Sequence, residues 1–180
     1  SIASPPSGDK IIELCVKIIE GSHTTSYIAK LQKGEKVELF GPAGKFVLEK
    51  DSFENDLIFV AVGTGITPFH SMINYLLRNG FNKKIILIKG FRTEKNILYD
   101  GEFSKLKNRY GNFEFHNILS RPENPNFENK GYVQNFIEKY LFKCPIVNIS
   151  CTPGGRRVPE VSGEIHRSRS VRKGYFLREV

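Results

Sequence analysis

The clearest candidate for chemistry is the stretch AVGTGITPFHSM, residues 61–72, which lies between an apolar run and a segment with helical spacing. Gly63 and Gly65 would allow positive φ and leave room for a ligand beside the backbone. Thr67 is placed to cap the following helix, and Pro68 fills its first position, where an amide hydrogen would lack a partner anyway. The remaining amides and the helix dipole favour an anion, so the pattern predicts a phosphate-binding turn.

This GxGxxP spacing is weak evidence when taken alone, because two glycines between a strand and a helix can form no more than a tight turn. The spacing differs from the dinucleotide fingerprint GxGxxG by its final proline, and no acidic residue closes the next expected strand as a ribose ligand would. The two alternatives are therefore a simple turn and a nucleotide binder of another class.

Other reactive side chains form no evident group. The histidines that invite a catalytic interpretation are His23, His70 and His116. None has a carboxylate at a useful spacing, so we expect them to have surface or packing roles. The three cysteines are Cys15, Cys144 and Cys151. Their odd number and wide spacing predict neither a disulfide framework nor a metal site, and favour a reducing compartment.

Strands and helices that could position the glycine turn alternate along residues 51–150. The strands are expected at 57–62, 83–90, 112–119 and 145–150, and the helices at 69–79, 99–111 and 131–142. Continuous apolar runs are typical of strands buried on both faces, and the alternation implies right-handed crossovers. We therefore predict an α/β domain with a parallel nucleotide-binding sheet.

Residues 1–50 have a different pattern. Short strands are expected at 11–19, 36–40 and 46–48, around a helical turn that contains Tyr27 and Ile28. This arrangement predicts part of an antiparallel β-barrel. Residues 151–180 have no apolar periodicity, and we interpret them as an atypical basic tail, a candidate for disorder, that arose from an unrelated extension or a reading-frame change.

Composition and charge limit the kinds of protein that this chain can be. The chain has 180 residues, 39% of them hydrophobic, and a net charge of +8. The tail holds seven basic and three acidic residues, a net +4, so half of the excess charge lies there and the rest forms no basic stripe. No apolar run approaches the roughly 20 residues that span a bilayer. We expect a soluble cytoplasmic protein with no membrane span and no nucleic-acid partner.

Several motifs, in order, resemble one family. They are SIAS, ELCVKII, GSHTTSYI, GPAGKF, VGTGITPF, LSRP and GYVQNF. Their order over residues 1–150 is similar to that of the ferredoxin-NADP reductase superfamily, flavoproteins with an FAD-binding barrel followed by a nicotinamide-nucleotide domain. The resemblance implies FAD and NADP, or NAD, as cofactors.

On the flavin side, the resemblance assigns roles to three segments. SIAS resembles the second half of the family's Arg-x-Tyr-Ser motif, which implies that Ser1 lies beside the isoalloxazine, near the atom that accepts hydride; an ordinary strand start is the alternative. The implied flavin contacts are Ser1, Ile2, Ala3, Ser4, Leu14, Cys15, Val16 and Lys17. A simple amphipathic strand would also explain the last four. Thr25 fits the hydroxyl that contacts the FAD pyrophosphate, and one extra residue after Gly21 leaves Ser26 as an alternative.

On the nucleotide side, the resemblance implies three sets of contacts. Gly63, Thr64, Gly65 and Pro68 match the loop at the NAD(P) pyrophosphate, and Arg92 matches a cation near the nucleotide, with an exposed surface arginine as the alternative. The implied 2′-phosphate ligands are Ser120, Arg121, Lys130 and Tyr132. Two cations and two hydroxyls suit a dianion, which favours NADP, although members that use NADH carry related residues. Cys151 matches a catalytic cysteine beside the nicotinamide, but Thr152 stands where the family has glycine.

The implied activity is hydride transfer from NAD(P)H to FAD, followed by electron transfer to ferredoxin, flavodoxin or an oxygenase component. The sequence begins at the serine of the flavin motif, so we expect a fragment whose incomplete barrel holds FAD poorly. A non-catalytic nucleotide-binding or interaction module is the alternative function. A nucleic-acid binder acting through its arginine-rich tail is a third, with no recognition motif to support it.

Overall fold

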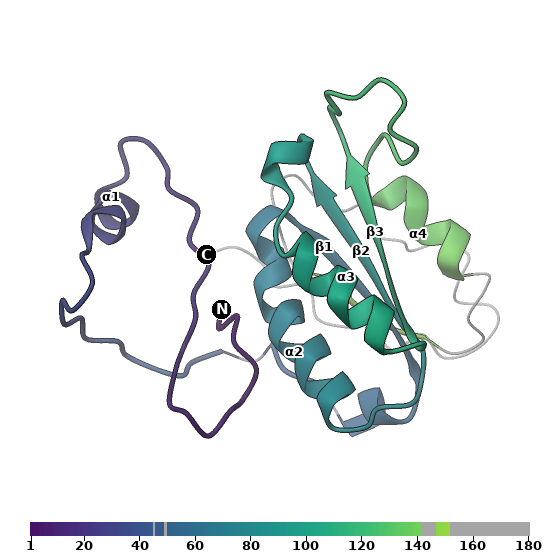
Figure 1. Ribbon diagram of the computed structural model, residues 1–180, viewed down its shortest axis with the longest axis horizontal. Coiled ribbons are helices and arrows are strands. Elements are labelled where there is room, and N and C mark those ends of the chain that lie inside the picture. The colour runs from purple at the N-terminus through teal and green to yellow at the C-terminus, as the bar shows by residue number, and fades with distance from the viewer. Residues whose placement is uncertain (45, 49, 142–146, 152–180) are drawn as a thin grey trace.

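A computed structural model describes residues 1–44, 46–48, 50–141 and 147–151. Its centre is a four-stranded parallel sheet in the order β3-β2-β1-β4 (Figure 1). The strands are β1 Asp56–Val62, β2 Ile85–Phe91, β3 Phe113–Leu119 and β4 Val147–Cys151. Each lies within two residues of its expected position, so the prediction of an α/β unit with a parallel sheet is confirmed.

Helices cover both faces of the sheet. They are α2 Thr67–Arg78, α3 Asp100–Arg109 and α4 Gln134–Leu141. Alternate strand residues point to opposite faces: Leu57 and Phe59 join a core with α2 and α3, whereas Ile58 and Val60 pack with Ile137 of α4. Burial on both faces explains why the strands are apolar throughout.

Helix α2 forms because its apolar side chains recur on one face. Phe69, Ile73 and Leu76 are buried against β1, and the ring centroids of Phe59 and Phe69 lie 4.9 Å apart. The helix ends at Arg78, and Gly80 follows with φ +78°, the left-handed conformation that commonly ends a helix.

The prediction that Thr67 caps this helix is wrong. The residue before the helix is Ile66, and it is already helical, because the single-turn helix η2 Gly63–Ile66 leads directly into α2. The Thr67 hydroxyl instead donates to the carbonyl of Thr64 at 2.6 Å. Pro68 is accordingly the second residue of the helix. A continuous helical path removes the extended residue that a side-chain cap requires.

The expected strands at 11–19, 36–40 and 46–48 are absent from the described residues of that region. Helix α1 His23–Lys30 forms as expected, and Ser22 accepts the amide of Thr25 at its start. The rest of this region has no regular secondary structure, as Figure 1 shows around α1. One isolated antiparallel bridge joins Ile2 to Leu14. The prediction of a partial barrel is therefore not confirmed.

The exposure of this region gives the physical reason. Ile11, Leu39 and Phe40 are 62%, 66% and 106% exposed, so in the described chain these apolar side chains have no second layer to pack against. Short strands without such a layer are at best marginally stable in water. The predictions for residues 152–180 lie outside the described residues. Across the described part of the chain, no helix has the length and apolar character needed to cross a membrane.

Candidate nucleotide-binding site

The glycine turn lies at the carboxyl end of β1, the central position of the sheet next to both β2 and β4. Gly63 has φ +56°, a conformation that few other residues adopt without strain. A Cβ on Gly63 would meet no atom within 4 Å, so its conformation, and not a shortage of space, requires glycine. Thr64 and Gly65 remain partly accessible, and α2 starts two residues later. The turn can therefore present backbone amides and a helix N-terminus to an anion.

The neighbouring strand ends bring basic residues to the same edge. Ser120 donates its amide to the carbonyl of Phe91 at 3.0 Å, and Arg121 donates to that of Arg92 at 2.8 Å. These bonds continue the pairing of β2 with β3 beyond the strands, so the backbones of the two arginines are adjacent. Both side chains are exposed. The fold thus joins two cations that are 29 positions apart in the sequence.

The segment between β3 and α4 returns to this edge. Gly131 donates to the carbonyl of Leu119 at 2.8 Å, and Leu119 donates to that of Asn129 at 3.0 Å. Lys130 therefore forms a parallel bridge with Leu119, the residue that directly precedes Ser120. Tyr132, which follows, is 67% exposed. The four residues assigned to a 2′-phosphate thus come from one folded loop at the carboxyl edge of the sheet.

Close packing fixes where this loop enters α4. A Cβ on Gly90 in β2 would lie 2.7 Å from Cγ1 of Val133, a separation that real Cβ atoms do not adopt. Val133 is buried in the core beneath α4. Glycine at position 90 thus lets the chain carrying Lys130 and Tyr132 cross the end of β2.

The match to known families agrees with this geometry. Residues 59–150 match the family of oxidoreductase NAD-binding domains, and residues 1–48 match that of oxidoreductase FAD-binding domains, in the expected order. The chain belongs to the ferredoxin-NADP reductase superfamily.

Curated relatives in the superfamily are reductases of several systems. The chain is 37% identical over 138 residues to the reductase component of phenol 2-monooxygenase, DmpP, of Pseudomonas sp., covering 75% of this chain and 39% of that protein. It is 34% identical over 134 residues to ferredoxin--NADP reductase B of Sorangium cellulosum, covering 74% and 54%. The chain thus spans about half or less of the length of these relatives.

Solved structures agree with this assignment. Ferredoxin-NADP+ reductase from Plasmodium falciparum superposes with a TM-score of 0.58 at 27% identity, covering 71% of this chain and 53% of that one. The Amycolatopsis cytochrome P450 reductase GcoB gives a TM-score of 0.73 at 23% identity, covering 84% and 46%, and supports the fold alone.

The flavin-side residues of this superfamily member divide into two groups in space. Residues 1–4 lie against residues 11–14, because Ala3 donates its amide to the carbonyl of Glu13 at 2.8 Å, and Ala3 is fully buried. Thr25 and Ser26 lie on α1, which Figure 1 shows well apart from the sheet. The Thr25 hydroxyl exchanges hydrogen bonds with the backbone of Ile19. The structure thus brings the first group near the nucleotide-binding unit and leaves the second remote.

The remaining flavin-side residues and the cysteine are located only in part. Cys15 is half-buried, whereas Leu14, Val16 and Lys17 are exposed. Cys151 ends β4 in register with Val60 of β1, which puts its backbone near the glycine turn at the same sheet edge. Its side chain lies outside the described part, so its role beside a nicotinamide stays a prediction.

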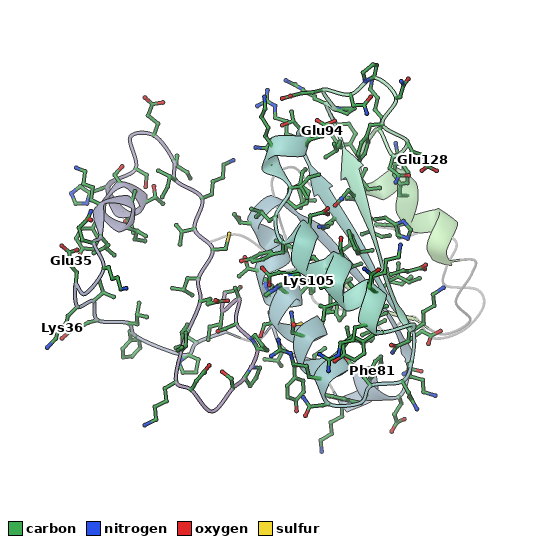
Figure 2. All side chains as sticks on the ribbon, in the orientation of Figure 1. Glu35, Lys36, Phe81, Glu94, Lys105 and Glu128 are labelled. Atoms are coloured by element: carbon green, nitrogen blue, oxygen red, sulfur yellow. The ribbon has the colours of Figure 1, made fainter. Side chains whose placement is uncertain are left out.

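Sequence reasoning missed Glu94, which fixes the loop described above. Its two carboxylate oxygens accept the backbone amides of Glu123 at 2.8 Å and Asn124 at 3.1 Å. Figure 2 labels Glu94 and, on the loop after β3, Glu128. These bonds, first that from Glu123, hold the pKa of Glu94 below its ordinary value. Lys95 also pairs with Glu123 at 3.0 Å. No local pattern links residues 94 and 123, so only the register of β2 with β3 could have revealed this contact.

Lys89 was also missed, because it lies inside an apolar strand. Its ammonium is fully buried, 3.0 Å from Oδ1 of Asp100 and 3.2 Å from the carbonyl of Leu98. Burial lowers the pKa of Lys89, and Asp100 opposes that shift. Burial would raise the pKa of Asp100, but hydrogen bonds from Asn117 and Lys89 hold it below its ordinary value. This pair anchors the start of α3 to the sheet, behind the candidate site.

Proposed function

We propose that this chain is the nucleotide-binding unit, with part of the flavin-binding unit, of an NAD(P)H-dependent FAD oxidoreductase. The main supporting observation is that one edge of the parallel sheet holds the glycine turn, Arg92, Ser120, Arg121 and Lys130. Ligands of doubly wound sheets bind at this edge, outside the carboxyl ends of the strands. The family match over residues 59–150 supports a nicotinamide nucleotide as that ligand.

The chemistry of the donors fits a dinucleotide. The pyrophosphate would lie on the glycine turn, where amides and the helix dipole favour negative charge. Ser120, Arg121, Lys130 and Tyr132 would bind a 2′-phosphate. In the described part of the chain, Arg92, Arg121 and Lys130 form no ion pair, whereas Glu123 is paired with Lys95 and Glu94 accepts two amides. The cations therefore stay available to a phosphate, which favours NADP over NAD.

FAD is the second cofactor of this proposal, supported by the family match over residues 1–48. Residues 1–4 and 14–17 would hold the isoalloxazine, Ser1 would lie near its hydride-accepting atom, and Thr25 or Ser26 would meet its pyrophosphate. Cys151 would lie beside the nicotinamide. The bound flavin supplies hydride acceptance and one-electron release. The chain itself contributes mainly orientation of the two ring systems.

The electron acceptor that we propose is a one-electron carrier or an oxygenase component. The names of the relatives support both, since one is the reductase component of phenol 2-monooxygenase and another a ferredoxin--NADP reductase. A cytoplasmic location belongs to the same proposal, supported by the scattered cysteines.

Calorimetric titration with 2′,5′-ADP and with 5′-AMP tests the nucleotide assignment. We expect 2′,5′-ADP to bind more tightly, and Arg121→Ala to remove most of that difference. Arg78→Ala, at the far end of α2, is the matched control and should change neither affinity. Equal binding of both ligands would refute the NADP preference, and binding of neither would refute the nucleotide site.

A flavin absorbance spectrum tests the enzyme assignment. Bound FAD that bleaches anaerobically with NADPH supports a reductase. The alternative is a non-catalytic nucleotide-binding or interaction module, favoured by the mostly exposed segment at 11–19, which forms no strand in the described chain. Binding of 2′,5′-ADP without retention of FAD would favour that alternative for this chain.

A further inference from the structure

Helix α2 carries a buried histidine that joins two parts of the chain distant in sequence. His70 lies one turn into the helix, after the glycine turn, and is 3% exposed. Its Nδ1 lies 2.8 Å from the carbonyl oxygen of Ala3, and its Nε2 lies 2.8 Å from Oε2 of Glu102 on α3. The adjacent Ser71 hydroxyl donates to the carbonyl of Ser4 at 2.8 Å. Two consecutive residues of α2 thus hold residues 3 and 4.

The two partners of His70 constrain its protonation state. A carbonyl oxygen can only accept a hydrogen bond, and so can an ionised carboxylate, whereas a neutral imidazole carries one N–H. The side chain of Glu102 is 58% exposed, where water stabilises its ionised form. Both 2.8 Å contacts are therefore satisfied together only when both ring nitrogens carry a proton. A neutral ring would leave the Ala3 carbonyl without its donor or turn a lone pair toward the carboxylate.

The surroundings suit a cation. The Tyr99 ring stacks on the imidazole, with centroids 4.2 Å apart and planes at 19°, and Phe103 meets it edge-on at 5.6 Å. Aromatic faces attract cations. The titratable groups that face this cluster are Glu102 and Tyr99 at α3, and Cys15 and Glu13 from the N-terminal segment. Burial, followed by Cys15, Glu102 and Glu13, raises the pKa of Tyr99 to about 12, so the phenol stays neutral.

We propose that His70 is a positioning residue which, as an imidazolium paired with Glu102, holds residues 1–4 against the nucleotide-binding unit. Because those residues are also tied to Glu13 through the Ala3 amide, the histidine sets the position of that whole junction relative to the glycine turn. The inference rests on the proposed function only where it treats residues 1–4 as flavin contacts.

Nitrogen NMR of the histidine-labelled chain gives the direct test, without flavin or nucleotide. At pH 7 we expect both His70 ring nitrogens to show the signature of protonated nitrogen. In Glu102→Gln the amide can donate to a neutral ring, so a neutral ring there is expected. Glu114→Gln, which breaks a surface pair with Lys84, is the matched control and should leave the His70 signals unchanged. A neutral His70 ring in the unmodified chain at pH 7 would overturn the proposal.

Hydrogen exchange at the Ala3 amide reports on the junction itself. We expect exchange in His70→Gln to be at least about tenfold faster than in the unmodified chain, as loss of a charge-assisted hydrogen bond implies. If His70→Gln leaves Ala3 protection unchanged, His70 is only a packing residue. Binding of 2′,5′-ADP, measured on the same samples, reports separately on the proposed function.

Discussion

The buried Lys89 gives the sharpest stability prediction, because removing its partner Asp100 and removing the lysine itself should change the free energy of unfolding differently. Removing Asp100 leaves a fully buried ammonium whose remaining stabilisation is the carbonyl of Leu98 and three aromatic rings, at 4.8 to 6.0 Å. Breaking a buried ion pair typically costs 3–5 kcal/mol. Because the side chain of Asp100 is 48% exposed, water can take part of its place. We therefore expect Asp100→Ala to lower the free energy of unfolding by about 2 to 3 kcal/mol.

Replacing the lysine itself should have a different result. Lys89→Met keeps most of the buried chain and removes the cation that must be desolvated, so we expect a change within about 1 kcal/mol of zero, or a gain. On the Lys89→Met background, Asp100→Ala should lose most of its cost, a coupling of about 2 kcal/mol. The matched control is Glu114→Ala, which breaks the exposed pair with Lys84 and should cost at most about 1 kcal/mol.

The pH dependence provides an independent check. The pKa of Lys89 is lowered in the folded state, so the unfolded state binds more protons and stability rises as pH approaches 10.5, the ordinary pKa of lysine. Without Asp100 that pKa falls further, so the loss in free energy of unfolding caused by Asp100→Ala should become smaller between pH 7 and pH 9.5. Urea unfolding followed by circular dichroism measures both quantities. A deficit that is negligible at pH 7, or that grows with pH, would refute the reasoning, as would a larger loss in Lys89→Met than in Asp100→Ala.

Three further predictions concern the site and its supports. Glu94→Gln should weaken 2′,5′-ADP binding several-fold in calorimetry, because the carboxylate uses both of its oxygens as acceptors and the amide has only one, with Glu128→Gln as the control. The pKa of Glu94 is lowered, so this contribution is present at neutral pH and is lost as pH falls through that pKa. Gly90→Ala should cost about 1 to 3 kcal/mol by urea unfolding, because its Cβ would collide with Val133, and an unchanged stability would contradict the packing. Tyr99→Phe should lessen the loss of stability between pH 10 and about 12. The raised pKa of Tyr99 stabilises the folded state below pH 10, and this contribution disappears as the pH rises to about 12. Identical alkaline unfolding curves for the variant and the unmodified chain would contradict this prediction.

Local sequence was sufficient to predict the α/β unit. Apolar runs fixed the strands, the spacing of Phe69, Ile73 and Leu76 fixed a helix, and the glycine turn marked the strand end that ligands approach. These features are local consequences of backbone geometry and of burial on both faces of a sheet. The resemblance also assigned residues of the loop after β3 to a 2′-phosphate, an assignment that stays a prediction, and nothing in their spacing showed that they would lie near Arg92.

Apart from the helix cap at Thr67, the failures have a physical cause in common, since each concerns an interaction with a distant partner. Residues 11–19 alternate as a strand should, yet a strand needs a neighbour and a covering layer, and in the described chain these apolar side chains are exposed. His70 looked like an isolated packing residue because its partners, Ala3 and Glu102, lie 67 and 32 positions away.

The sequence by itself determined the helices and strands of the α/β unit and the chemical types available at the sheet edge. Only the tertiary structure decided which charges meet: the pairing of β2 with β3 brings Glu94 to the amides of the loop after β3, and the packing of α3 beside α2 brings Glu102 to His70. The reason is that backbone preference acts over a few residues, whereas hydrogen bonds and ion pairs depend on separations in space that only the folded chain sets.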